Sequence, residues 1–148
     1  MVTSQQCLRK YGEPSASNPC MVLWDVPTEL EIGIIPKKIY CNRDLIKPAT
    51  MAFKNLIDSG CVNEIKTYDG CFNIRKSRGL NSMSLHSWAI ALDFNAFSNP
   101  LGLSREQCIL RGLKPFSIEF GNCFKSAGFD WGNDWNRKDL MHFQLKSI

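Results

Sequence analysis

The sequence has no long apolar run. Among its 148 residues, no stretch approaches the roughly 20 apolar residues that a membrane-spanning helix needs. Residues 1–12 contain no apolar segment behind their basic residues, which argues against a secretory signal peptide. We therefore expect no membrane insertion, and synthesis in the cytoplasm without an export signal.

A C-x-x-C spacing is also missing, although the chain has seven cysteines. Zinc ribbons and zinc fingers need such paired ligands, so the absence of this spacing excludes them. Without an export signal, the cysteines are expected to be reduced and to pack as small apolar side chains.

No basic tract, internal repeat or low-complexity segment is present. The net charge of +4 is mild and the lysines and arginines are dispersed, so nothing indicates a nucleic-acid partner. Apolar residues make up 44% and charged residues 22% of the chain, as is usual for globular proteins. The length predicts one domain, which we expect to be a monomer, with an irregular lead-in over residues 1–34 and a core over residues 35–148.

Histidine is scarce, and both copies lie in segments that also carry aspartate. His86 precedes Asp93 by seven residues, and His142 follows Asp139 by three. Two imidazoles and one carboxylate form a three-ligand zinc site with an open fourth position. The pattern therefore predicts one Zn²⁺ held by His86, Asp93 and His142.

The remaining carboxylate, Asp139, is expected to act as the acid/base of a hydrolase. Zinc lowers the pKa of bound water to roughly 7 and polarises the carbonyl under attack. A carboxylate that is not a ligand can then take the water proton and pass it to the leaving amine.

Two arginines and a serine near the first histidine are candidate substrate contacts. Arg75 is placed to hold a substrate carboxylate or a developing oxyanion, and Arg78 is the competing choice. Ser84, two residues before His86, is expected to orient that histidine or to contact substrate. Each of these residues, taken alone, also fits an ordinary packed or solvated side chain.

Apolar periodicity predicts three helices, over about 47–59, 104–110 and 117–127. The first is expected to begin at Lys47-Pro48 and to end at Gly60. Strands are predicted at 21–24, 38–41, 91–95 and 140–145, with a hairpin turn at Asp69-Gly70. If the strands over 91–95 and 140–145 are neighbours, Asp93 and His142 converge. We expect an α+β fold: a small antiparallel sheet with helices packed on one side.

The pattern Ser84-x-His86-x6-Asp93 followed by Asp139-x-x-His142 resembles the VanY-type D-Ala-D-Ala carboxypeptidases and L-alanyl-D-glutamate endopeptidases. These are zinc peptidases of bacterial cell-wall peptide, and many are phage endolysins. Further similar blocks occur at 68–75, 91–100 and 128–132, so the resemblance covers about residues 35–146.

The resemblance implies a fold of the hedgehog/D-Ala-D-Ala-peptidase type. It implies zinc ligation by His86, Asp93 and His142, Asp139 as the acid/base, and Arg75 as the substrate-side arginine. One departure is visible, because Ala89 stands where the family usually has glycine. If that position requires a positive φ, alanine costs about 1 kcal/mol there; if it only requires a small side chain, alanine is harmless.

From the motif and the resemblance we expect a zinc-dependent peptidase that cuts an amide bond in the stem peptide of peptidoglycan. The leading hypothesis is an L-alanyl-D-glutamate endopeptidase acting as a phage endolysin, which reaches the cell wall after release from the host cytoplasm or on a virion. The alternatives are a D-Ala-D-Ala carboxypeptidase or dipeptidase, and a non-catalytic wall-binding module that holds zinc.

Overall fold

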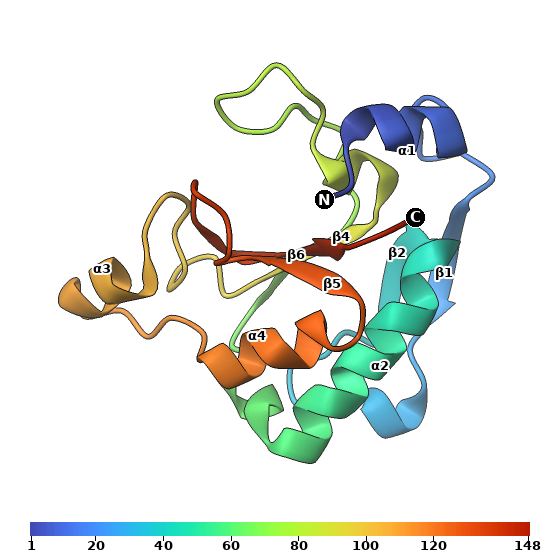
Figure 1. Ribbon diagram of the computed structural model, residues 1–148. Coiled ribbons are helices and arrows are strands. Elements are labelled where there is room, and N and C mark those ends of the chain that lie inside the picture. Colours follow the sequence, from blue (N-terminus) through green and yellow to red (C-terminus); the bar gives the residue numbers. More distant parts are fainter.

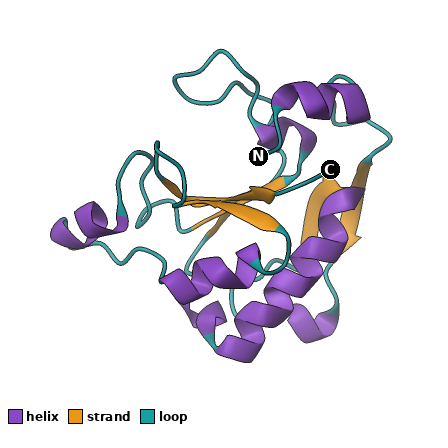
Figure 2. Cartoon of the chain, in the orientation of Figure 1, coloured by secondary structure: helices purple, strands orange, loops and turns teal.

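The computed structural model describes residues 1–148 and has an α+β fold with two antiparallel sheets (Figures 1 and 2). The expected fold class is thus confirmed. One sheet has two strands, β1 (Met21–Asp25) and β2 (Lys38–Asn42). The other has four strands in the order β3 (Tyr68–Gly70), β4 (Ala91–Phe94), β6 (Asp139–Leu145) and β5 (Phe129–Gly132).

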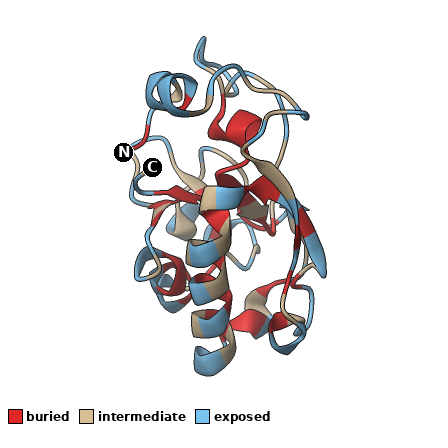
Figure 3. Ribbon diagram, turned by 90° about the vertical axis from the view of Figure 1, so that its right-hand side faces the viewer, coloured by how far each residue is buried: buried red, intermediate tan, exposed pale blue.

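Two helices, α2 (Arg43–Ser59) and α4 (Ile118–Lys125), cover one face of the four-stranded sheet (Figure 1). Aromatic rings fill the space between sheet and helices. The ring centroids of Phe124 on α4 and Phe143 on β6, for example, are 4.1 Å apart and stacked. Thirty-two buried apolar residues form one continuous cluster, and the outer surfaces of the helices are exposed (Figure 3). The opposite face of the sheet is left to polar side chains.

The long helix α2 begins at Arg43, four residues before the predicted start at Lys47. The side chain of Asn42 accepts a hydrogen bond from the backbone N–H of Asp44 and so caps the helix. Pro48 lies inside the helix rather than in its first turn. The end is as predicted, with Gly60 in the left-handed conformation at φ 80°.

The predicted hairpin at Asp69-Gly70 is wrong. These two residues belong to β3, which pairs antiparallel with β4, so Gly70 lies opposite Asp93. The preceding residues form a 3-10 turn, η2 (Cys61–Glu64), and not a strand. Gly70 has φ 128° and the register shifts next to it. Gly70 therefore lies at an irregularity in an edge strand. Glycine occurs at such irregularities as well as in tight turns.

Residues 1–34 are not irregular, in contrast to the prediction. They contain α1 (Ser4–Tyr11), β1 and the 3-10 turn η1 (Thr28–Leu30). Thr3 and Gln6 form a capping box at the start of α1. The helix lies on the side of the sheet opposite α2 (Figure 1), and the hydroxyl of Tyr11 donates a 2.7 Å hydrogen bond to Asp44.

The remaining helix, α3 (Arg105–Leu110), lies where a helix was predicted, and Ser104 and Gln107 form a capping box at its start. No helix of the protein is both long and apolar enough to cross a membrane. All seven cysteines are free, and all but Cys20 are buried. Burial raises the pKa of the Cys41 thiol to about 12, so this thiol stays protonated and packs as an apolar group.

The contact between α1 and α2 predicts a pH-dependent effect of replacing Asp44. Burial alone would raise the pKa of Asp44, but hydrogen bonds from Tyr11 and Lys10 lower it below its ordinary value of 3.8. A carboxylate with a depressed pKa stabilises the fold above its unfolded-state pKa, and this stabilisation is lost as the pH falls through the folded-state pKa. Asp44→Asn is expected to lower the free energy of unfolding by about 1 kcal/mol at pH 7, and by much less at pH 2.5.

Urea unfolding at the two pH values measures this difference. Asp25→Asn is the matched control, because Asp25 forms a 3.5 Å ion pair with Lys38 while its side chain is 81% exposed. An equal loss for Asp44→Asn at both pH values would contradict the linkage.

Candidate metal centre

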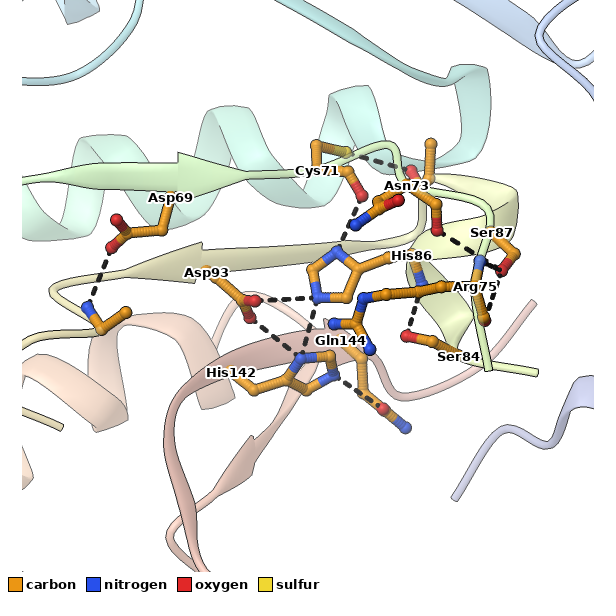
Figure 4. Close-up of polar contacts among 12 residues, drawn as sticks. Asp69, Cys71, Asn73, Arg75, Ser84, His86, Ser87, Asp93, His142 and Gln144 are labelled. Atoms are coloured by element: carbon orange, nitrogen blue, oxygen red, sulfur yellow. Dashed lines mark hydrogen bonds and ion pairs between the residues drawn. The ribbon is translucent and has the colours of Figure 1, made fainter. Parts of the chain in front are cut away.

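The pairing of β4 with β6 places an aspartate directly opposite a histidine. The two strands are antiparallel, and Asp93 is the register partner of His142. Their side chains lie on the same face, and Oδ1 of Asp93 is 3.0 Å from Nδ1 of His142 (Figure 4). The convergence predicted from the alternation of the two strands is therefore present.

The third member, His86, comes from a short 3-10 turn, η3 (Leu85–Trp88). Ser84 caps this turn, and its Oγ accepts a hydrogen bond from the backbone N–H of His86. The His86 side chain is brought beside the strand pair, with Nε2 3.1 Å from Oδ2 of Asp93 and 3.1 Å from Nδ1 of His142. The three residues predicted as ligands thus meet at one point.

Two acceptors on the far sides of the rings fix where the ring protons lie. Nδ1 of His86 is 2.7 Å from the carbonyl oxygen of Cys71, which can only accept, so this nitrogen carries the proton. Nε2 of His142 is 3.0 Å from Oε1 of Gln144. In the neutral rings the lone pairs of the other two nitrogens therefore face Asp93 and each other.

This donor set fits a divalent metal ion. The donor atoms of His86, Asp93 and His142 all lie within 4.8 Å of one another. Ligands about 2.0–2.2 Å from a tetrahedral zinc ion are roughly 3.4 Å apart, close to the separations of 3.0–3.1 Å found between these atoms. Two imidazole lone pairs and a carboxylate converge here, and no hydrogen-bond donor lies between them. Such an arrangement is a site for a cation.

The charges of the three groups are coupled. Burial alone would raise the pKa of Asp93, yet the hydrogen bonds and positive charges that His142 and His86 offer when their rings are protonated hold it well below its ordinary range. Burial alone would lower the pKa of His142, but the hydrogen bond and the negative charge of Asp93 raise it. Asp93 is therefore an anion over the whole physiological pH range, as a metal ligand must be.

A bulge in β6 brings Asp139 to the same cleft as His142. In a regular strand, residues three apart point to opposite faces. Here the register shifts between two consecutive residues of β5: Trp131 pairs with Phe143, whereas Gly132 pairs with Asp139. A side chain at Gly132 would overlap the backbone carbonyl of Asp139, so glycine is required for this close approach.

Asp139 carries a buried carboxylate oxygen without a partner. Its Oδ1 is buried and makes no hydrogen bond. Burial raises the pKa of Asp139, and the negative charge of Asp93 adds to this, while His142 partly offsets it. An unsatisfied carboxylate with an elevated pKa is a group that can accept a proton and return it.

The metal centre opens into a cleft of about 510 Å³. Arg75, Arg78 and Ser84 line this cleft together with Asp93 and Asp139. The backbone N–H of Arg75 donates to Oγ of Ser87, and its side chain extends toward the histidines in the view of Figure 4. All the predicted substrate contacts thus border one cavity, and their contact with substrate stays a prediction.

Several residues around the three predicted ligands and the cleft were not predicted from the sequence. Gln144 shares a strand face with His142 two residues away, so strand periodicity was the available signal. Arg137 in the β5–β6 connection and the carbonyl of Cys71 carried no such signal. Residues 1–4, expected to be part of an irregular lead-in, also line the cleft.

The three tryptophans near the motifs divide into two kinds. Trp88 and Trp131 are buried and belong to the core. Trp135 lines the cleft, and its ring centroid is 5.5 Å from that of His142. Only Trp135 is therefore positioned as a substrate wall.

Part of the chain matches a known protein family. Residues 78–145 match the family model described as D-alanyl-D-alanine carboxypeptidase. This segment contains the three predicted ligands together with Asp139, Arg78 and Ser84, so the VanY-type resemblance is confirmed there. Arg75 and the other residues before 78 lie outside the match. No curated protein and no solved structure matches the chain.

Ala89, which ends η3, has a left-handed backbone with φ 53° and ψ 40°. Of the two alternatives for this position, a positive φ or only a small side chain, the structure shows the positive φ. Ala89→Gly relieves strain of about 1 kcal/mol and loses a buried methyl group worth about 0.8 kcal/mol. We expect the free energy of unfolding to change by less than about 1 kcal/mol.

The control is Ala91→Gly, because Ala91 is equally buried but lies in β4 without a positive φ. This change has no strain to relieve and should cost about 2 kcal/mol. Urea unfolding of the two variants measures the difference, and equal destabilisation would contradict the assignment of strain to Ala89.

The hydrogen bond from His142 to Gln144 predicts an effect on metal affinity. Gln144→Leu removes the acceptor that orients the ring, and we expect zinc affinity to fall about 10- to 100-fold. Gln144→Glu keeps an acceptor at the same position and should retain affinity. Competition with a chromophoric chelator measures both, and unchanged affinity in Gln144→Leu would show that the contact does not position the ring.

Proposed function

We propose, from the match of residues 78–145 to the D-alanyl-D-alanine carboxypeptidase family, that this protein is a zinc-dependent peptidase of bacterial peptidoglycan. The observation that carries the proposal is the convergence of His86, Asp93 and His142 in a cleft that Asp139 also lines. Residues 1–148 would form one peptidase domain acting as a monomer, without nucleic acid or membrane as partner.

His86, Asp93 and His142 would hold one Zn²⁺ ion. Two neutral imidazoles and a carboxylate suit zinc and leave one coordination position open. When bound, zinc supplies an activated water and polarises the substrate carbonyl. Cys71 and Gln144 keep the two ring protons away from the ion, so both imidazoles present lone pairs without a change of tautomer.

Asp139 would be the proton carrier. It takes a proton from the attacking water and delivers it to the nitrogen of the leaving amine, and these two transfers leave its charge unchanged at the end of the cycle. Its raised pKa makes the carboxylate a better acceptor for the proton of the attacking water. The free Oδ1 supports this role because no protein donor competes for that atom.

Arg75 would hold a substrate carboxylate or stabilise negative charge on the carbonyl oxygen as the amide bond is attacked. Arg78, which lines the same cleft, is the other candidate for this contact. Ser84 would act mainly by orienting His86, since its hydroxyl caps the turn that carries this histidine.

The finer activity that we propose is cleavage of the L-alanyl-D-glutamate bond by a phage endolysin. Such an enzyme would be made in the host cytoplasm and reach the wall after release or on a virion. The description of the matched family favours a second candidate, a D-Ala-D-Ala carboxypeptidase or dipeptidase. A non-catalytic zinc-containing wall-binding module would have no use for Asp139, a buried carboxylate held in the cleft.

Asp139→Asn separates catalysis from metal binding. The amide cannot carry the proton, so we expect turnover of purified muropeptides to fall about 10²- to 10⁴-fold while zinc content stays unchanged. His86→Ala should lose both zinc and activity, and a chelator should abolish wild-type activity. Mass spectrometry of the products identifies the new amino terminus and so distinguishes the endopeptidase from the carboxypeptidase.

Asp58→Asn is the control for loss of a carboxylate, since Asp58 is exposed on α2 away from the cleft. Hydrolysis that proceeds equally fast in chelator would refute metal dependence. Failure of the zinc-loaded protein to cleave any muropeptide would refute the peptidase activity.

A further inference from the structure

Three arginines from two separate segments of the chain line the cleft of the metal centre. Arg75 and Arg78 precede η3, whereas Arg137 belongs to the connection between β5 and β6. The two segments meet at Gly79, where a Cβ atom, if the residue had one, would lie 3.8 Å from Nη2 of Arg137. The Arg137 guanidinium is thus beside the residue that follows Arg78.

None of these guanidinium groups has an acidic partner in the protein. The five ion pairs of the structure involve lysines and histidines only. Arg75 donates a hydrogen bond to the backbone oxygen of Lys76, and neither Arg78 nor Arg137 has an acidic side chain within ion-pair distance. Three positive charges that form no ion pair around one cavity indicate that an anionic ligand can pair with them.

The carboxylates within the cleft offset only part of this charge, and the charge of Arg137 acts on Asp139. Asp93 is engaged by both histidines, and Asp139 is the only other acidic residue of the lining. The rest of the lining is apolar or uncharged and includes Leu80, Met83 and Trp135. The cavity therefore combines apolar walls with an excess of positive charge.

We propose that Arg78 and Arg137 form a second carboxylate-binding site, which selects stem peptides that carry at least two free carboxylates. This inference rests on the proposed peptidase function. Arg75, whose side chain extends toward the two histidines (Figure 4), takes the carboxylate beside the scissile bond. Arg78 and Arg137 take the next one, because a guanidinium pairs with a carboxylate through two parallel hydrogen bonds and makes no such pair with a carboxamide.

The preferred substrate is therefore a stem peptide with free carboxylates on both its D-glutamyl and its diamino-acid residues. The amidated form of the same peptide is disfavoured, because a carboxamide offers no negative charge to pair with the two guanidinium groups. Amidation changes neither the length nor the apolar surface of the peptide, so any preference reports on the charge contact.

The experiment compares two synthetic muropeptides that differ only in whether the second carboxylate is free or amidated. We expect kcat/KM of the zinc-loaded wild-type protein to be about 10- to 100-fold higher for the free acid. Arg137→Gln should bring this ratio close to one, and Arg137→Lys should give an intermediate ratio because it keeps charge but loses the two-pronged geometry.

Lys76→Gln is the matched control, since it removes a positive charge from the same segment while its side chain does not line the cleft. Its ratio should equal that of the wild type. A wild-type ratio near one, or a ratio that Arg137→Gln leaves unchanged, would overturn the second carboxylate site.

Calorimetric binding of the two peptides to Asp139→Asn separates this inference from the proposed function. If no peptide is cleaved but the free acid still binds more tightly, and Arg137→Gln removes that preference, the carboxylate site stands although the peptidase function fails. Equal binding of both peptides would refute the carboxylate site even if both peptides are cleaved by the wild-type protein.

Discussion

The antiparallel pairing of β4 with β6 is the constraint on which the site depends. It fixes Asp93 opposite His142 by backbone hydrogen bonds, so the strand register alone places the two side chains next to each other. The reverse faces of the same strands carry Leu92 and Phe143, which anchor the pair in the helical layer. A register slip of one residue would exchange these faces. Burial of the core and assembly of the metal centre are thus enforced by the same register.

The surroundings of the three predicted ligands explain how such a concentration of polar groups is tolerated below the surface. An unpaired buried polar group is costly, but the outer nitrogen of each imidazole has an acceptor, from Cys71 and Gln144. The inner nitrogen of each imidazole faces Asp93 and the other ring, where a cation can bind. Asp139 and Asp130 are the exceptions, each with one buried carboxylate oxygen unsatisfied. Of the two, Asp139 lines the cleft, and its unsatisfied oxygen supports the proposed role as a proton acceptor.

The sequence predicted the parts that depend on local pattern. Alternation in the strands over 91–95 and 140–145 located Asp93 and His142 on one face, and apolar periodicity located α3 and α4. It failed where one residue type has two uses. Gly70 was interpreted as a hairpin turn but belongs to an edge strand, and Pro48 was interpreted as a helix start although Asn42 caps α2 earlier. The helix α1, which begins with a capping box at Thr3, was likewise not predicted, because residues 1–34 were interpreted as irregular.

Contacts between distant segments lay beyond local pattern. Nothing near Arg137 in the chain indicates that it reaches Gly79, because this approach depends on how two irregular connections fold over the sheet. The bulge that turns Asp139 toward His142 depends in the same way on Gly132, seven residues earlier, which alone admits the backbone of Asp139. Metal ligands can be found from sequence because their chemistry restricts the residue types. Residues that select a substrate are restricted only by position, so they become visible once the strands and loops that bring them together are known.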